Sequence, residues 1–295
     1  LWCPVPPGKK PECGFTLSLQ LLCRQRCGVK RVMFGLLHNN GNYVLSRNFR
    51  QQVVGDLDWV LNNYNLLNVS CGVDEIIVLD VGSNRNSEEF AEHIRVISNS
   101  CFVPLAAGGG ITNQETAALF MASGADKLVL NTALFSDPDL VSGLVKKYGS
   151  QCIVGSFDYI RKGDVYQIYC PSSDAAEVPS VSEHIESVRR LGAGEILCQS
   201  VEKDGTGMGL DLEFADRFLG EVSLPTIMLG GVGRAEHIFQ GLKHECVDAV
   251  CTANLLNFIG DAFEHSRSQL VSGGILLPQF STVELEALRG YFETG

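Results

Sequence analysis

The stretch "PLAAGGGITNQE", residues 104–115, has a close counterpart in "PTIMLGGVGRAE", residues 225–236. Each is a short apolar run that ends in glycines and leads into polar residues. A short apolar run bounded by glycines is typical of a buried strand, and the polar residues that follow are typical of a helix start. The chain therefore contains the same strand, turn and helix unit twice.

The repetition continues on both sides of these stretches. An acidic residue opens an apolar run ahead of each copy, in "DEIIVLD" and "GEILCQS", and an Asp precedes the run that follows each copy. The paired landmarks lie 120, 121 and 122 residues apart and are Glu75/Glu195, Pro104/Pro225 and Asp126/Asp248. A shared offset of this kind indicates an internal duplication.

Each half contains four strand candidates separated by helical patterns. They lie near residues 31–37, 75–80, 103–107 and 127–131, and near 152–158, 195–200, 225–229 and 248–252. Most are continuous apolar runs, which are typical of a parallel sheet covered by helices. Eight such strands with twofold sequence symmetry predict a closed (β/α)8 TIM barrel built from two duplicated half-barrels, and a doubly wound open sheet is the alternative. The helix after the first glycine run is expected to begin with a capping box of Thr112 and Glu115.

We expect residues 30–295 to form one barrel, with half-barrels of about 30–150 and 151–270 and a C-terminal segment, 271–295. Residues 1–29 contain Cys3, Cys13, Cys23 and Cys27 and are expected to lie outside the fold, without the spacing of a zinc site. The segments 38–56 and 159–183 follow the first strand of each half. Both are long and polar, so we expect them to be active-site loops.

The composition excludes several classes of function. A net charge of −11 argues against a broad surface for nucleic acid or anionic membranes. No apolar run approaches the roughly 20 residues of a membrane span, and the scattered cysteines suit a reducing compartment, so we expect a cytoplasmic protein. The six histidines show no metal-ligand spacing. Neither a metal nor a cofactor is therefore expected.

Ligands of such barrels bind where the strands end, so the residues at these ends are candidates. Glycines followed by a helix start suit a phosphate, because backbone N–H groups can approach it closely, although glycines can also simply form tight corners. Two such turns predict a ligand with two phosphates. Asp158 ends the fifth strand and is a candidate acid or base, whereas Leu37 ends the first and cannot transfer a proton. Asp80 and His38 also lie near this end.

Together with "GADKLVLNTAL" (124–134), "GAGEILCQSVEKDGTGMGLD" (192–211) and "LGGVG" (229–233), these motifs resemble HisF, the cyclase subunit of imidazole glycerol phosphate synthase, over roughly residues 30–265. The resemblance implies a barrel that takes ammonia from a glutaminase on its bottom face. It implies that this ammonia cleaves and cyclises a bis-phosphorylated ribonucleotide. The phosphate contacts that it implies are Gly109, Gly110, Asn131, Thr132, Gly205, Gly231, Ala253 and Asn254.

The same resemblance assigns the remaining functional residues. The catalytic pair would end strands one and five, where this chain has Leu37 and Asp158. The family's usual lysine in the loop after strand one is also missing, and Leu45 stands nearest its place. The resemblance implies an ammonia gate made of Arg31, Glu75, Lys127 and Glu195, with Asp126 at the glutaminase interface. A stabilising ring of ion pairs is the alternative for these four residues.

Three functions follow from this combination. The lost acid and the segment "RNFRQQVVGD" (47–56) resemble the HisF-like, WbuZ-type proteins of surface-sugar amidation, which implies a HisH-type glutaminase partner and a sugar amidotransferase that receives the ammonia. The second hypothesis is an imidazole glycerol phosphate synthase cyclase that has rerouted its acid/base chemistry through Asp158 with His38 or Asp80. The third is a non-catalytic phosphate-binding scaffold or regulatory subunit.

Overall fold

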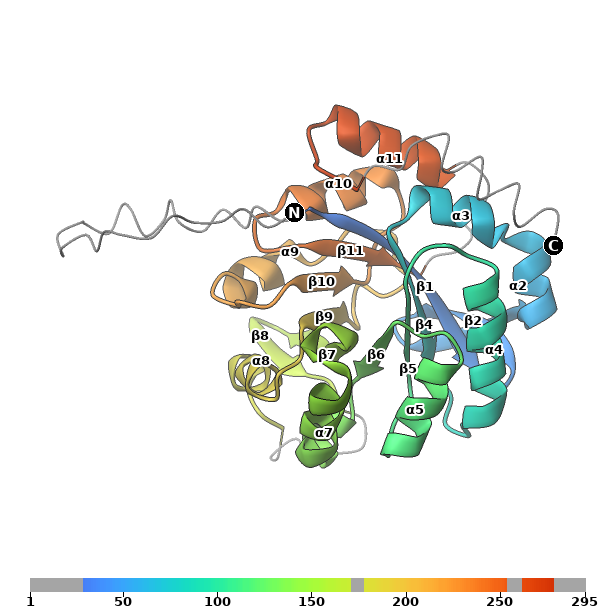
Figure 1. The fold of residues 1–295 in the computed structure, drawn as a ribbon. Helices are drawn as coiled ribbons and strands as arrows, with labels where there is room; N and C mark the ends of the chain where they lie inside the picture. The colour runs from blue at the N-terminus through green and yellow to red at the C-terminus, as the bar shows by residue number, and fades with distance from the viewer. Residues whose placement is uncertain (1–28, 171–177, 254–261, 279–295) are drawn as a thin grey trace, which may run out of the picture.

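The computed structural model describes residues 29–170, 178–253 and 262–278. Within them, eight parallel strands close into a barrel with helices outside it, as the sequence predicts (Figure 1). The barrel strands are β1 (Arg31–Asn39), β4 (Glu75–Asp80), β5 (Leu105–Gly108), β6 (Lys127–Leu130), β7 (Ile153–Lys162), β9 (Glu195–Ser200), β10 (Thr226–Leu229) and β11 (Ala249–Thr252).

The barrel closes because β1 pairs in parallel with both β4 and β11. Arg31 lies opposite Ala249 in the register with β11, and Met33 lies opposite Glu75 in the register with β4. The eight barrel strands therefore pair all the way round with no open edge among them, which removes the alternative of a doubly wound open sheet.

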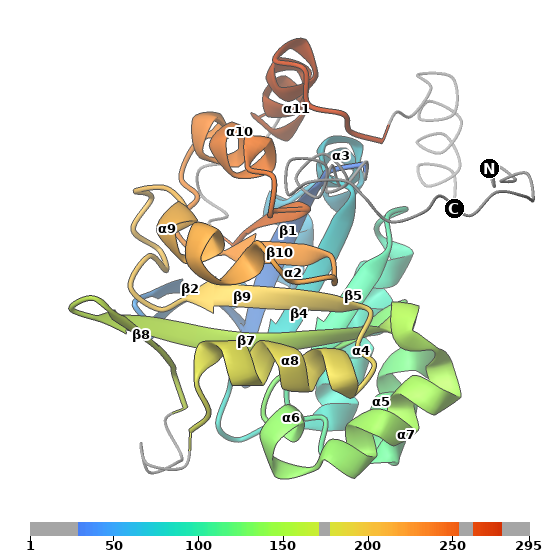
Figure 2. The same ribbon diagram turned by 90° about the vertical axis from the view of Figure 1, so that its left-hand side faces the viewer.

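The helices and short turns fill the connections. They are α2 (Leu57–Asn63), α3 (Leu66–Gly72), α4 (Ser87–Asn99), α5 (Gln114–Ala122), α6 (Ala133–Ser136), α7 (Pro138–Tyr148), η1 (Ser150–Cys152), α8 (Val181–Arg190), α9 (Leu212–Phe214), η2 (Ala215–Leu219), α10 (Ala235–Lys243) and α11 (Ala262–Ser272). The second view shows α8 running along β7 on the outside of the barrel (Figure 2). No helix in the described part of the chain is long and apolar enough to cross a membrane.

One predicted helix start was wrong by a residue. Asn113, and not Thr112, is the N-cap of α5, and its side chain accepts a hydrogen bond from the backbone N–H of Thr116 at 2.8 Å. Asn is as strong an N-cap as Thr or stronger, so two adjacent candidates competed for the same position.

The duplication is visible in matching hydrogen bonds at the start of two strands. The Asp126 carboxylate accepts from the backbone N–H of Leu105 at 2.9 Å, and the Asp248 carboxylate accepts from that of Thr226 at 2.8 Å. Each Asp lies just before the next strand and joins two neighbouring strands at the same end of the barrel. The repeated sequence landmarks therefore perform the same structural task in both halves.

The predicted active-site loops are largely strands. Residues 38–56 form the end of β1 and a hairpin of β2 (Asn42–Arg47) and β3 (Arg50–Asp56), while β8 (Val165–Ile168) pairs antiparallel with the extended β7. Tyr43 and Val44 of β2 are buried, whereas Arg50, Gln51 and Gln52 of β3 are exposed, so only part of the hairpin is covered. The predicted position at the mouth was correct, because both hairpins lie at the same end of the barrel (Figure 2).

The end of the chain that is described packs on the barrel. Arg267 of α11 donates to the Asp74 carboxylate at 2.7 Å, and the backbone N–H of Lys30 donates to the Leu276 carbonyl at 3.0 Å. The predicted boundary near residue 270 falls inside α11. The Cys-containing residues 1–28, and residues 279–295 of the predicted C-terminal segment, lie outside the described residues.

Two apolar cores hold the fold together. The larger core lies between the strands and the surrounding helices. The smaller core fills the barrel and consists of Met33, Ile77, Ala106, Val129, Val154, Leu197, Ile227, Leu229, Ala249 and Cys251. The interior between the two ends of the barrel is therefore apolar.

Candidate functional site

A ring of four charged side chains stands where the barrel strands begin. Arg31 donates to one carboxylate oxygen of Glu75 at 2.9 Å and to both oxygens of Glu195 at 3.1 and 3.0 Å. Lys127 Nζ donates to Glu75 at 2.7 Å and to Glu195 at 3.1 Å. Each cation thus bridges both carboxylates. The four residues that the sequence analysis assigned to a gate do meet in one closed ring.

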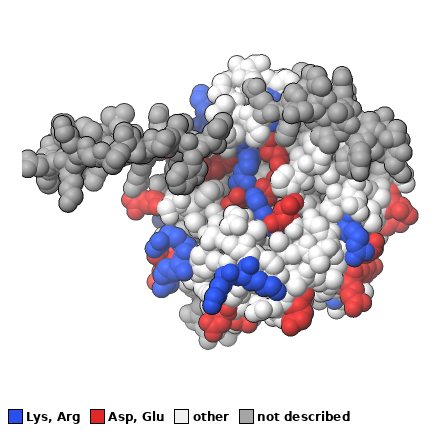
Figure 3. All heavy atoms as spheres, in the orientation of Figure 1, with Lys and Arg blue, Asp and Glu red and all other residues white. Residues whose placement is uncertain are grey.

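This ring is largely withdrawn from solvent. The Glu75 side chain is 2% exposed, and those of Arg31, Lys127 and Glu195 are 19%, 16% and 14% exposed. Burial raises the pKa of the Glu75 carboxyl, and the adjacent charge of Lys127 works against that shift. One face of the molecule shows Lys or Arg atoms and Asp or Glu atoms side by side at its centre, among mostly uncharged atoms (Figure 3).

At the opposite end, the first strand offers no acid. Leu37 is 4% exposed, pairs with Leu79 of β4 and lines a cavity at the mouth. A leucine side chain neither gives nor takes a proton, so this position near the end of β1 contributes only apolar surface.

Asp158 of β7 is positioned by a residue that the sequence analysis assigned to phosphate binding. The Asn131 amide donates to the Asp158 carboxylate at 3.1 Å. Burial raises the pKa of Asp158 to about 7, against the opposing effect of the Asn131 hydrogen bond and with a further increase from the Asp204 charge. A carboxyl that titrates near neutral pH suits general acid or base catalysis.

The first glycine turn follows β5. Gly109 and Gly110 have φ angles of +104° and +68°, which favour glycine. A Cβ at Gly109 would lie 2.2 Å from the Asp80 carbonyl oxygen, so this glycine permits close packing of backbone on backbone. A Cβ at Gly110 would lie 2.5 Å from the Arg85 side chain. Thr132, at the start of α6, makes no side-chain capping bond there.

The second glycine turn, after β10, is packed against the loop that follows β9. Gly231 has a φ of +95°, and a Cβ there would lie 2.1 Å from the Gly209 carbonyl oxygen. Gly205 likewise leaves room for the Ser46 carbonyl oxygen of the hairpin, 2.1 Å from where its Cβ would be. These glycines have a packing role whatever ligand they bind. Asn254, predicted as a phosphate contact, lies outside the described residues.

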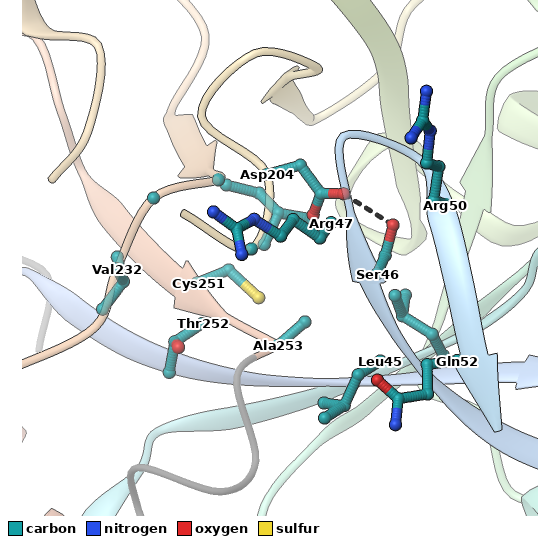
Figure 4. A pocket seen from close by; sticks show the side chains of 15 residues that line it. Leu45, Ser46, Arg47, Arg50, Gln52, Asp204, Val232, Cys251, Thr252 and Ala253 are labelled. Carbon is teal, nitrogen blue, oxygen red and sulfur yellow. Dashed lines mark hydrogen bonds between the residues drawn. The ribbon is translucent and has the colours of Figure 1, made fainter. Parts of the chain in front are cut away.

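A cavity of about 200 Å³ lies between the second glycine turn and the β2–β3 hairpin (Figure 4). The ends of β1, β10 and β11 contribute apolar walls, and the hairpin and the Asp204 loop contribute polar ones. The lining includes three predicted site residues and two unpredicted arginines, namely Gly205, Gly231, Ala253, Arg47 and Arg50.

The hairpin is fastened over this cavity by a set of bonds that we call the Asp204 clasp, made by Ser46, Asn48, Phe49 and Asp204. The Asp204 carboxylate accepts from the Ser46 hydroxyl at 2.5 Å and from the Phe49 backbone N–H at 3.0 Å. The Asn48 amide donates to the Glu202 carbonyl at 2.9 Å. Burial raises the pKa of Asp204, and the two bonds that it accepts oppose that shift.

The clasp holds a strained turn. Asn48 and Phe49 have φ angles of +50° and +61°, a region that Asn tolerates and Phe rarely adopts. Such strain persists only where surrounding bonds determine the conformation, and it concentrates at functional sites. The sequence analysis missed this turn and Arg47. Asn48 was a possible signal of a turn, because Asn tolerates a positive φ. The Phe that follows it rarely adopts such a φ, so the turn was not predicted.

His38 of β1 and Asp80 of β4 are buried next to the turns at the mouth of the barrel. The His38 ring accepts from the Gly41 backbone N–H at 3.0 Å through Nε2, and its Nδ1 lies 3.4 Å from the Asp80 carboxylate. Both side chains are buried, and Asp80 also accepts from Gly82 at 3.0 Å. These bonds hold the His38 ring on the turn after β1 and the Asp80 carboxylate on the turn after β4, and neither residue lines the cavity.

Within the described residues, no group of His, Cys, Asp and Glu side chains is arranged to hold a metal ion. The buried thiols of Cys198 and Cys251 have raised pKa values because burial disfavours the thiolate. The groups left to carry chemistry in this barrel are therefore the Asp158 carboxyl, the cavity at the mouth and the ring of four charged residues.

Comparisons with known proteins agree with this arrangement. The family model described as "Histidine biosynthesis protein" matches residues 39–260. A protein of Parasynechococcus marenigrum named "Putative imidazole glycerol phosphate synthase subunit hisF2" is 39% identical over 81% of this chain and 90% of its own length. A protein of the same name from Vibrio vulnificus is 35% identical over 74% of this chain and 80% of its own length.

A third relative carries the name of the cyclase family itself. The imidazole glycerol phosphate synthase subunit HisF of Chlorobium limicola is 33% identical over 68% of this chain and 81% of its own length. The closed barrel, the family match and the extent of these similarities together show that this chain belongs to the HisF family.

Proposed function

We propose that this barrel receives ammonia from a HisH-type glutaminase at the ring and passes it through its interior to the mouth. There the ammonia serves a sugar amidotransferase that acts on a surface polysaccharide precursor. The observation that carries the proposal is the contrast between the ends: the four ring residues are bonded together, whereas Leu37 stands where the cyclase reaction needs an acid.

The chemistry of the interior supports ammonia transfer. Ammonia is neutral and small, while the ammonium ion is charged and costly to place among apolar side chains. A ring of bridged charges followed by an apolar core would therefore admit ammonia and exclude the ion. Lys127 bonds to both glutamates, so a change in its side-chain conformation would open the ring on one side.

Imidazole glycerol phosphate synthesis is the second candidate. The pKa of Asp158, raised to about 7 by burial, favours acid/base chemistry at the mouth. Against it, the His38 ring is bonded to the turn after β1 and the Asp80 carboxylate to the turn after β4, so neither replaces the missing acid. A single acid gives only half of the proton transfers that a paired mechanism distributes over two groups.

Asp126 provides a test of the glutaminase partner. Asp126 is exposed at the end of the barrel where the strands begin. One of its carboxylate oxygens accepts a hydrogen bond from the Leu105 backbone N–H. Asp126→Asn keeps an acceptor for that bond and removes the charge. We expect it to weaken the affinity for a HisH-type glutaminase about tenfold, measured by isothermal titration calorimetry, because charge pairs at an interface contribute on this scale.

Asp164→Asn is the matched control. Asp164 is fully exposed in the turn between β7 and β8, at the other end of the barrel. This variant should bind the glutaminase as the unmodified chain does. Equal affinities for all three proteins, or no binding by the unmodified chain, would remove the support for a glutaminase on the ring face.

A further inference from the structure

The turn between β1 and β2 is closed by a histidine side chain. Its two central residues, Asn40 and Gly41, have φ angles of +50° and +75°, which are typical of a type I′ hairpin turn. The Gly41 backbone N–H donates to Nε2 of His38 at 3.0 Å. The His38 side chain is 2% exposed, so water does not readily replace the ring as an acceptor. The closed turn therefore depends on a ring nitrogen that carries no proton.

This bond determines where the proton of the neutral His38 ring lies. Since Nε2 accepts, the proton of the neutral ring is on Nδ1. Nδ1 makes no hydrogen bond within the described residues, although the Asp80 carboxylate lies 3.4 Å away. A charged imidazole donates from both nitrogens. A charged His38 can therefore approach Asp80 through Nδ1, but it can no longer accept from Gly41.

Other ring side chains pack around His38. Tyr43 of β2 and His93 of α4 lie beside it, with ring centroids 5.8 and 4.9 Å from that of His38. Phe90 of α4 lies at 5.0 Å. The Tyr43 hydroxyl and Nδ1 of His93 are 3.2 Å apart, so these two groups pair with each other. Together with Asp80 of β4, the cluster contains two imidazoles, one phenol and one carboxylate.

Two of these groups stay neutral near pH 7. Burial lowers the pKa of His93, and the neighbouring His38 ring lowers it further. The charges that oppose this shift are those of Glu89, Glu92 and Asp56. Burial raises the pKa of the Tyr43 hydroxyl. Two imidazoles at this distance do not both become charged, because like charges repel.

Carboxylates flank His38 and its turn. Asp80 stands beside Nδ1, and Oε1 of Glu89 would lie 2.8 Å from a Cβ placed on Gly41. A positive charge on His38 therefore has one carboxylate next to the ring and another next to the turn that the ring releases. A proton that enters the cluster thus goes to His38.

The turn anchors the base of the β2–β3 hairpin, which forms a wall of the cavity at the mouth. Leu45, Ser46 and Gln52 of this hairpin line the cavity. The Asp204 clasp fastens the tip of the hairpin, whereas the bond from Gly41 to His38 fastens its base. Loss of the bond at the base therefore loosens this wall while the clasp still holds the tip.

We propose that His38 is a pH-sensitive latch of the barrel mouth: its neutral ring closes the β1–β2 turn, and its protonation releases the turn and loosens the cavity wall. The proton binds to Nε2, and the hydrogen bond from Gly41 to that nitrogen breaks. Imidazoles titrate between about pH 5 and 8, so the latch operates in this range. The inference does not depend on which ligand or reaction the barrel serves.

Nuclear magnetic resonance of the isotope-labelled full chain tests the latch at both partners of the bond. The ring spectrum of His38 should show the tautomer with its proton on Nδ1 at about pH 8. The protection factor of the Gly41 amide against hydrogen exchange is corrected for the intrinsic effect of pH. It should fall about tenfold between about pH 8 and pH 5, since one hydrogen bond contributes about this factor. Amides of β4 report global unfolding and should keep their protection.

His38→Gln removes the titrating ring and keeps a side-chain acceptor for Gly41, so its Gly41 protection should change less than about twofold over the same range. His244→Gln is the matched control. It removes an imidazole that pairs with Asp216 at 3.0 Å and precedes β11, at the other end of the barrel. This variant should keep the full response of the unmodified chain.

Four results would overturn the proposal: a His38 proton on Nε2 at about pH 8, constant Gly41 protection in the unmodified chain, an equal fall in His38→Gln, or a lost response in His244→Gln. The first two need no variant, so they decide the question even where a variant fails to fold. No measurement needs ammonia or a glutaminase, so this inference and the proposed function can fail separately.

Discussion

Arg31→Met should lower the free energy of unfolding by about 3 kcal/mol, because it leaves two largely buried carboxylates with one cation between them. Arg31 makes three of the five hydrogen bonds in the ring, and Glu75 is only 2% exposed. Methionine fills a similar volume, so the loss reports the charge and its bonds more than a cavity. Chemical denaturation followed by circular dichroism measures the change.

The control is Arg161→Met, which breaks an ion pair with Glu213 on the outside of the barrel. Exposed pairs contribute little, so this variant should unfold almost as the unmodified chain does. A further variant, Arg31→Met with Glu195→Gln, restores the balance of charge and should recover part of the stability. Equal stability of Arg31→Met and Arg161→Met would show that the ring is not a buried network.

Asp158→Asn should make the protein more stable at pH 8, by about 2 kcal/mol, and the difference should vanish at low pH. Burial raises the pKa of Asp158 from 3.8 to about 7. The folded state therefore binds the proton more tightly than the unfolded state does. Stability is fully present below pH 3.8 and declines as the pH rises through about 7. We expect less than the full energy of the shift, because the side chain keeps partial contact with solvent.

The asparagine at position 158 can still accept the hydrogen bond from Asn131, so the variant removes the charge and keeps the contact. Unfolding curves at several pH values between 5 and 8 measure the effect, with Asp164→Asn as the exposed control. A constant difference between the variant and the unmodified chain across this range would contradict a titrating Asp158. An acid that destabilises the fold in its charged form is typical of a residue kept for function.

The barrel was predictable because the duplication states the same pattern twice. Glu75 and Glu195, or Asp126 and Asp248, recur at one offset, and in the structure the two Asp residues make equivalent bonds to neighbouring strands. The ring was predicted from the resemblance to the HisF family, and its members stand at strand starts that the sequence marks clearly. Long-range pairing then follows from the closed topology.

The mouth was less predictable because its contacts join segments without a shared pattern. Asn131 follows an apolar run as a phosphate ligand would, yet its amide donates to Asp158. Nothing local in the sequence connects Asp204 with Ser46, which lie 158 positions apart and meet only because β1 and β9 end at the same face. The hydrogen-bond partners of polar side chains depend on three-dimensional geometry, which the spacing of residues along the sequence does not determine.

The most direct test of the central claim is an assay of the purified chain with ammonium and the bis-phosphorylated ribonucleotide of histidine synthesis. The account predicts no imidazole glycerol phosphate, because Leu37 cannot supply the second proton transfer. Turnover at a rate that Asp158→Asn abolishes would contradict it and would establish this barrel as a working cyclase.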